Sequence, residues 1–210
     1  MNRPSDTNLT LERHGINLWW QGYSGLRLNH LKSKLRTLSS LEDTPDVIVL
    51  HVAGNHDLGA YEIGDLRYFL RAQLRYIKRH YPNKKIDMVP NSTTDKLASP
   101  ENNKAMEKAR KRLNSYAATR TIGMGGAYIK YPNIYLANTE LWSADCIHLS
   151  NVGNERFLNS LQHALENIVL HGAVVYPWSS FISKFVVWSG RITLVPLPHI
   201  VAVVVSCQQS

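Results

Sequence analysis

The stretch Asp46-Val-Ile-Val-Leu-His-Val-Ala-Gly-Asn-His-Asp57 decides the fold class of this chain. Its first part, residues 46–52, is a nearly continuous apolar run, which is typical of a central parallel strand covered on both faces. The run opens into Gly54-Asn55-His56-Asp57, a polar turn of the kind that follows such a strand. We therefore expect a buried strand here, with polar side chains at its carboxyl end.

The sequence around this strand alternates between strand-like and helix-like stretches. Further strands are predicted at residues 16–20, 85–89 and 127–130. Helical spacing of apolar residues predicts helices at 28–40, 101–119 and 151–170, and a long helix from about residue 63 that Pro82 ends. Such alternation is the signature of an α/β domain. The expected architecture is a three-layer α/β/α sandwich built on a parallel sheet.

The chain is long enough for one domain of this kind, with 210 residues of which 44% are hydrophobic. We expect a polar N-terminal segment at 1–15, the α/β domain at 16–170 and an apolar, irregular tail at 171–210. The tail is interrupted by Pro177, Pro196 and Pro198 and shows no periodicity that connects it to the domain, so it is expected to be poorly ordered. Two cysteines, Cys146 and Cys207, are too few for a disulfide framework.

The sequence shows no signal for export or membrane insertion. The N-terminal residues are polar, and no stretch has the ~18 to 20 uninterrupted apolar residues of a spanning helix. We therefore expect an intracellular protein, cytoplasmic or nuclear, without a membrane partner.

The formal net charge is +8, and the positive charge is concentrated in two predicted helices. The two clusters are Arg67, Arg71, Arg75, Lys78, Arg79, Lys84 and Lys85, and Lys104, Lys108, Arg110, Lys111 and Arg112. Solvated outer helix faces would account for both clusters. The alternative is contact with a polyanion, of which nucleic acid is the commonest.

Three short polar constellations fall where a parallel sheet places its active site, at the carboxyl ends of strands. They are Gly22-Tyr-Ser-Gly25, Gly54-Asn55, and Asp145 with His148 three residues later. Together they supply a glycine-turn N–H, a side-chain amide, and a carboxylate beside an imidazole. An acyl-transfer enzyme uses such groups to hold an oxyanion and activate a hydroxyl.

These constellations resemble three sequence blocks of the SGNH (GDSL-type) hydrolases. Trp20-Gln-Gly-Tyr-Ser-Gly-Leu-Arg-Leu28 is similar to block II, His51-Val-Ala-Gly-Asn55 with Asp57-Leu-Gly59 to block III, and Asp145-Cys-Ile-His-Leu-Ser150 to block V. The resemblance covers residues 13 to 168. It implies a parallel sheet of the SGNH/flavodoxin-like type and hydrolysis of a carboxylic ester.

Two further segments resemble the variant of this family found beside reverse transcriptases in animal retroelements. They are Asp87-Met-Val-Pro90 and Glu107-Lys-Ala-Arg110. The resemblance thus points to a retroelement-associated, esterase-like protein.

The resemblance also implies roles for four residues. Gly25 would donate its backbone N–H to the oxyanion and Asn55 its side-chain amide, while His148 would be the general base and Asp145 would orient it. No metal or cofactor is implied, and the substrate would be a small acyl ester. Each residue also has a structural alternative: a turn into a helix for Gly25, a loop cap for Asn55, and a helix-entry hydrogen bond for Asp145 with His148.

Three departures from the family pattern bear on activity. Block I, a Gly-Asp-Ser or Gly-Ser-Ser turn after an apolar strand, is absent before Ile16, so the sheet is expected to lack its first strand and the site its serine. His56 separates Asn55 from Asp57, and the strand before Asp87 is short. Loss of a catalytic-triad member costs on the order of 10⁴ to 10⁶ in rate. We therefore expect little or no esterase activity, the alternative being a non-enzymatic nucleic-acid-binding or vestigial domain.

Two other enzymatic interpretations fit less of the sequence. Ser24 could be a nucleophile on a strand-to-helix elbow, but Leu26 stands where the elbow motif has its second glycine. Gly54-Asn-His-Asp57 resembles a metal-binding turn of calcineurin-like phosphoesterases, but the upstream carboxylate motifs of a dinuclear site are missing.

Overall fold

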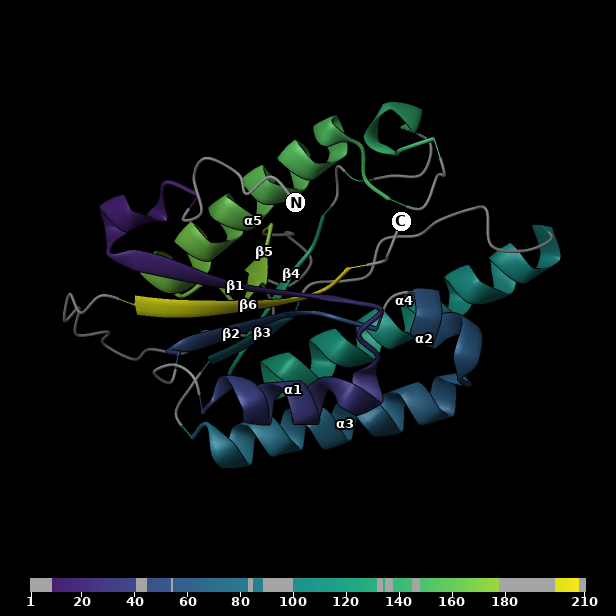
Figure 1. Cartoon of the computed structure of the whole chain (residues 1–210), viewed down its shortest axis with the longest axis horizontal. Helices are drawn as coiled ribbons and strands as arrows, with labels where there is room; N and C mark the ends of the chain where they lie inside the picture. Colours follow the sequence, from purple (N-terminus) through teal and green to yellow (C-terminus); the bar gives the residue numbers. More distant parts are fainter. Residues whose placement is uncertain are drawn as a thin grey trace, which may run out of the picture.

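The computed structural model describes residues 9–40, 45–53, 55–82, 85–88, 100–131, 134, 138–144, 148–177 and 199–207. These residues build a parallel six-stranded sheet with helices on both faces (Figure 1). The order across the sheet is β1-β6-β2-β3-β4-β5. The strands are β1 (Ile16–Ser24), β2 (Val47–His51), β3 (Lys85–Met88), β4 (Ala127–Ile129), β5 (Val175–Tyr176) and β6 (His199–Cys207).

The helices divide between the two faces of the sheet. In Figure 1, α1, α3 and α4 lie below the sheet and α5 lies above it. The α-helices are α1 (Leu31–Leu38), α2 (Asn55–Ala60), α3 (Ile63–His80), α4 (Pro100–Gly123) and α5 (Asn151–His171), and the short 3-10 turns are η1 (Leu11–His14), η2 (Leu28–His30) and η3 (Thr139–Leu141). The α/β class with a parallel sheet, expected from the sequence, is confirmed.

Strand β2 shows why an apolar run without polar alternation predicts a central strand. Ile48 and Leu50 belong to the core cluster that α1, α3 and α4 complete, whereas Val47 and Val49 belong to the cluster that α5 completes. All four side chains are buried. Because successive residues of a strand point to opposite faces, both faces of β2 must be apolar. Each such side chain contributes about 1.5–3 kcal/mol by leaving water.

Helix α3 covers one of these faces with residues at helical spacing. Leu66, Leu70, Leu74 and Ile77 are fully buried, and the helix ends at His80, just before Pro82. Tyr81 then folds back against the core, where its buried hydroxyl donates a hydrogen bond of 3.0 Å to the carbonyl of Leu35 in α1. This bond fixes α1 and the end of α3 relative to each other.

The expectation of an irregular tail at 171–210 is wrong for two segments. Val175–Tyr176 pairs with β4 as β5, and His199–Cys207 forms β6 between β1 and β2, in parallel register with both. The sheet was expected to lack its first strand. Instead, a strand from the C-terminal part of the chain, β6, lies between β1 and β2. The intervening residues, 178–198, lie outside the described part of the chain.

The N-terminal boundary also differs from the expectation. Leu11, in the segment expected to be a separate polar extension, is fully buried in the cluster that contains Ile16 and the inner face of α5. Arg13 forms an ion pair of 2.7 Å with Glu166 of α5. The first strand continues to Ser24 instead of ending near Trp20, so the turn begins at Gly25.

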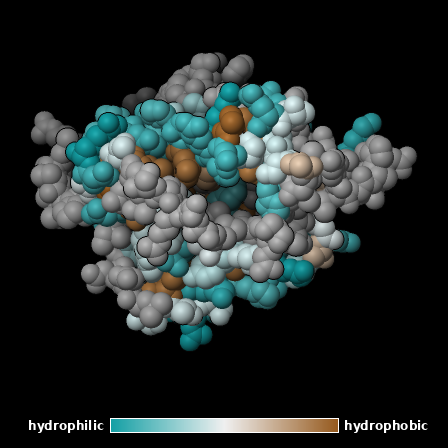
Figure 2. Space-filling model, turned by 45° about the horizontal axis from the view of Figure 1, so that its top comes forward, coloured by the Kyte–Doolittle hydropathy of each residue, from teal (hydrophilic) through white to brown (hydrophobic). Residues whose placement is uncertain are grey.

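The surface of the described residues is largely polar. On the face shown in Figure 2, hydrophilic residues predominate among the coloured atoms and hydrophobic ones form small separate areas. Among the described residues, the large hydrophobic side chains that are exposed are Tyr68 and Val152. No helix in the described part has the length and apolar character needed to cross a membrane.

Candidate functional site

The first turn at the carboxyl edge of the sheet follows β1. Gly25 adopts a left-handed conformation with φ of +59°, which a residue with a side chain rarely takes. A Cβ atom added there would meet nothing within 4 Å. The backbone angle, and not close packing, therefore requires glycine at this position. Ser24 is the last residue of the strand, and the left-handed residue at this turn is Gly25, so Ser24 does not occupy a nucleophile elbow.

The second turn follows β2 and contains a strained residue. Ala53 has φ of +71°, a conformation that costs roughly 1–2 kcal/mol in a residue other than glycine. Helix α2 begins two residues later, at Asn55. The backbone of Asn55 is thus placed at the carboxyl edge, while its side chain lies outside the described residues.

Asp57 ties these two turns together. Its side chain is fully buried, and Oδ2 accepts a hydrogen bond of 3.1 Å from the backbone N–H of Leu28. Leu28 lies three residues after Gly25, and Asp57 lies two residues after Asn55. The bond therefore brings together the segments that carry the two expected oxyanion donors. Asp57 falls in the segment that resembles block III, separated from Asn55 by His56, and this positioning role was not predicted from the sequence.

The third segment reaches the same edge through α5. Because α5 connects the parallel strands β4 and β5, its amino terminus must lie at the carboxyl edge of the sheet. His148 precedes this terminus and is half-buried, and its backbone carbonyl accepts a hydrogen bond of 2.8 Å from the N–H of Ser143. Asp145 lies outside the described residues, so its expected contact with His148 stays a prediction.

Ser150 caps the amino terminus of α5, two residues after His148. Its hydroxyl oxygen accepts a bond of 3.1 Å from the N–H of Gly153 and donates one of 2.6 Å to the carbonyl of Glu140. Capping of this kind stabilises a helix by about 1 kcal/mol. The cap fixes the end of the loop that carries His148.

A second histidine lies at this edge, and the sequence did not single it out. His51 ends β2, and its ring meets the edge of Phe157 at a centroid distance of 5.5 Å, while Tyr131 stacks on the same phenylalanine at 4.9 Å. Within the described part of the chain, His51 Nδ1 and the Tyr131 hydroxyl are buried without a hydrogen-bond partner. Burial lowers the pKa of His51 to about 4 and raises the pKa of Tyr131. His51 is therefore neutral near pH 7.

The depressed pKa of His51 makes the stability of the fold depend on pH. An unfolded chain binds a proton at this histidine near pH 6.5, whereas the folded chain resists protonation until about pH 4. Stability should therefore be complete above about pH 7 and fall by roughly 2 kcal/mol by pH 5. Urea unfolding across this range checks the slope, and His51→Phe should flatten it. An equal slope in the variant would show that another group is responsible.

The backbone register adds two residues to the edge that the sequence had left in the tail. Ser206 is level with Tyr23, and Cys207 is level with Ser24. Both residues directly follow the apolar run 200–205. The length and β-branched composition of this run are typical of a strand, and a strand could have been predicted from them. A hydroxyl-bearing and a thiol-bearing residue thus reach the carboxyl edge of the sheet.

As far as the structure describes them, the expected site residues lie at the same edge of the sheet. Gly25, the backbone of Asn55 and His148 lie along one edge, and Asp57 links the first two. Among the described residues, no three His, Cys, Asp or Glu side chains come together as a metal-binding group. Comparison of the chain with family models, with curated proteins and with solved structures finds no match.

Proposed function

We propose that this chain is an SGNH-type, three-layer α/β/α ester hydrolase-like domain with an acyl-ester site at the carboxyl edge of its sheet. The hydrogen bond from Leu28 to Asp57 carries the proposal, because it joins the two turns on which the expected oxyanion donors lie. The Asp87-Met-Val-Pro90 and Glu107-Lys-Ala-Arg110 segments support an origin in the retroelement-associated variant.

The proposed roles follow the chemistry of acyl transfer. The N–H of Gly25 and the amide of Asn55 would stabilise negative charge on the acyl oxygen, and His148 would accept the proton of an attacking hydroxyl. Asp145 would hold the imidazole in the productive tautomer. All of these groups come from the protein itself, so the proposed site uses no metal and no cofactor.

The domain lacks a serine in the position that block I gives it, and we expect this to limit turnover. Oxyanion donors and a base without a nucleophile leave only weak activation of water. We therefore propose an impaired or inactive hydrolase. Ser206 and Cys207 are the first residues to test for a substitute nucleophile, because their backbone positions are level with the end of β1.

The test is hydrolysis of p-nitrophenyl butyrate by the full chain. We expect the rate to equal that of the His148→Ala variant and of the matched control His171→Ala, whose exposed histidine lies at the far end of α5. Turnover that is lost in His148→Ala and kept in the control would contradict an inactive site. Turnover that survives His148→Ala would contradict the assigned base, and Ser206→Ala and Cys207→Ala would then locate the nucleophile.

A further inference from the structure

Helices α3 and α4 form a strongly basic depression whose lining includes none of the residues of the proposed acyl-ester site. One groove of about 960 Å³ follows α4, and a second of about 470 Å³ adjoins it through Thr119 and Arg120. Ten cationic side chains line the two grooves, which we call together the basic groove. They are Arg67, Arg71, Arg75, Lys78 and Arg79 of α3, and Lys104, Lys108, Lys111, Arg112 and Arg120 of α4.

The positive charge of the basic groove is almost uncompensated. All ten cationic residues are exposed. Within the described residues, Glu107 is the one carboxylate that lines the groove, and it pairs with Arg110 at 2.7 Å and Lys111 at 3.2 Å. Like charges held this close repel one another unless counterions or an anionic ligand neutralise them. The arrangement therefore favours binding of an extended polyanion.

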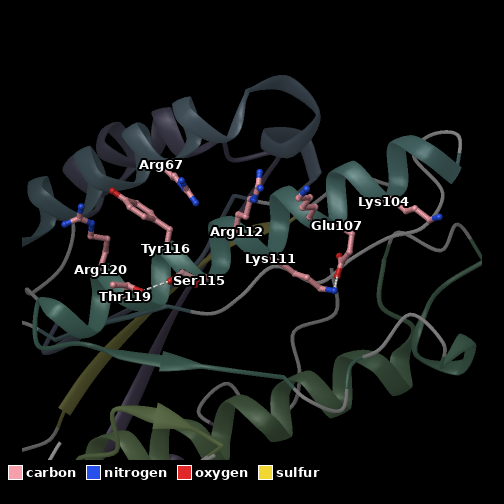
Figure 3. Close-up of a pocket in the computed structure, with 10 residues that line it drawn as sticks. Arg67, Lys104, Glu107, Lys111, Arg112, Ser115, Tyr116, Thr119 and Arg120 are labelled. Carbon is pink, nitrogen blue, oxygen red and sulfur yellow. Dashed lines mark hydrogen bonds and ion pairs between the residues drawn. The ribbon is translucent and has the colours of Figure 1, made fainter. Parts of the chain in front are cut away.

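Tyr116 gives the basic groove an aromatic platform. Its half-buried ring lies between two guanidinium groups, with Arg67 at 5.5 Å and Arg120 at 5.1 Å from the ring centroid. Figure 3 shows Arg67 reaching from α3 toward Tyr116, and Arg112 on the side of α4 that faces α3. Aromatic rings and guanidinium planes are the surfaces on which unpaired bases stack.

We propose that the basic groove binds single-stranded nucleic acid, with phosphates along its cations and a base at Tyr116. From Lys104 to Arg120, α4 spans about 24 Å at 1.5 Å per residue. That length matches roughly seven nucleotides of a stacked strand at 3.4 Å each.

An anionic membrane surface fits the basic groove less well. The groove is concave and elongated, and membrane-binding helices also insert apolar side chains. The exposed large hydrophobic residues among those described, Tyr68 and Val152, do not line it. The inference is also independent of the proposed hydrolase site, because Gly25, Asn55 and His148 take no part in it.

Fluorescence anisotropy with a labelled oligouridylate of about 20 nucleotides, at several salt concentrations, tests the proposal. The groove variant combines Arg67→Gln, Arg112→Gln and Arg120→Gln. Its control combines Lys32→Gln, Lys34→Gln and Arg36→Gln, which removes the same charge from exposed positions of α1. Circular dichroism verifies that both variants are folded.

We expect the groove variant to bind at least about tenfold more weakly at 0.1 M salt. The slope of log affinity against log salt should also become less steep by about 2. The control should stay within about threefold of the parent chain. Tyr116→Leu should weaken binding about tenfold at an unchanged slope. Absent binding at roughly 50 mM salt, equal weakening in the control, or binding to phosphatidylserine vesicles but not to the oligonucleotide would overturn the proposal.

Discussion

Deletion of residues 199–210 should abolish cooperative folding of this chain. The deletion removes β6, which pairs with β1 from Ile16 to Ser24 and with β2 from Val47 to His51. Its loss leaves a gap of about 9–10 Å between β1 and β2, twice the spacing of neighbouring strands. The backbone groups on both sides of the gap lose their partners. We expect the cost to exceed the total stability of a domain, which is about 5–15 kcal/mol.

Circular dichroism and thermal unfolding measure this outcome. A matched deletion of residues 208–210 leaves β6 intact and should retain the transition of the full chain. Val203→Pro tests the same position of β6 in the full-length chain and should also abolish the transition. Proline removes a backbone donor from the middle of this interior strand. A cooperative transition in the chain shortened at residue 198 would contradict the central position of β6.

Gly126→Ala should destabilise the fold by about 2–4 kcal/mol, because the new methyl group has no room. A Cβ atom at this position would collide with the backbone carbonyl of Ile86 in β3 and with the Thr121 side chain. Neither can move freely, because Ile86 is paired with β2 in the sheet and Thr121 is fully buried. In addition, Gly126 N–H bonds to the Thr121 carbonyl at 3.0 Å, and Ala127 N–H bonds to buried Asp87 at 2.9 Å. These bonds fix β4 against β3 at the point where α4 ends.

Gly123→Ala is the matched control for this substitution. Gly123 is the last residue of α4, and a Cβ atom there would meet nothing within 4 Å. We expect the control to change the free energy of unfolding by less than about 1 kcal/mol. Urea unfolding compares the two variants under identical conditions. Equal stabilities would show that β4 does not approach β3 as closely as described.

Much of this fold follows from local sequence patterns. The run 46–52 and the helical spacing in α3 predict their elements because each pattern reports burial within one segment. Strand β6 was not predicted from the sequence, although its apolar run resembles that of β2. Its place between β1 and β2 depends on pairing with residues far away in the sequence, and the prolines before it suggested a break. Local periodicity carries no information on such pairing.

The candidate site was predictable to a similar extent. Parallel topology brings Gly25 and Asn55 to one edge, which the positions of their turns after strands already indicated. The Asp57 bond to Leu28 and the burial of His51 depend on tertiary packing, so neither could be read from spacing. The two basic clusters were visible in the sequence, but their union in one groove requires the packing of α3 against α4.

The proposed site requires His148 to lie close to the turns that follow β1 and β2, and paramagnetic broadening in NMR spectra measures this proximity. A nitroxide would be attached at His148→Cys in a chain whose Cys146 and Cys207 are replaced by serine. We expect strong broadening of the Gly25 and Asn55 amide signals and little at Ile16, which lies about 26 Å from Ser24 at the other end of β1. Broadening at Ile16 with sharp Gly25 and Asn55 signals would contradict the proposed proximity.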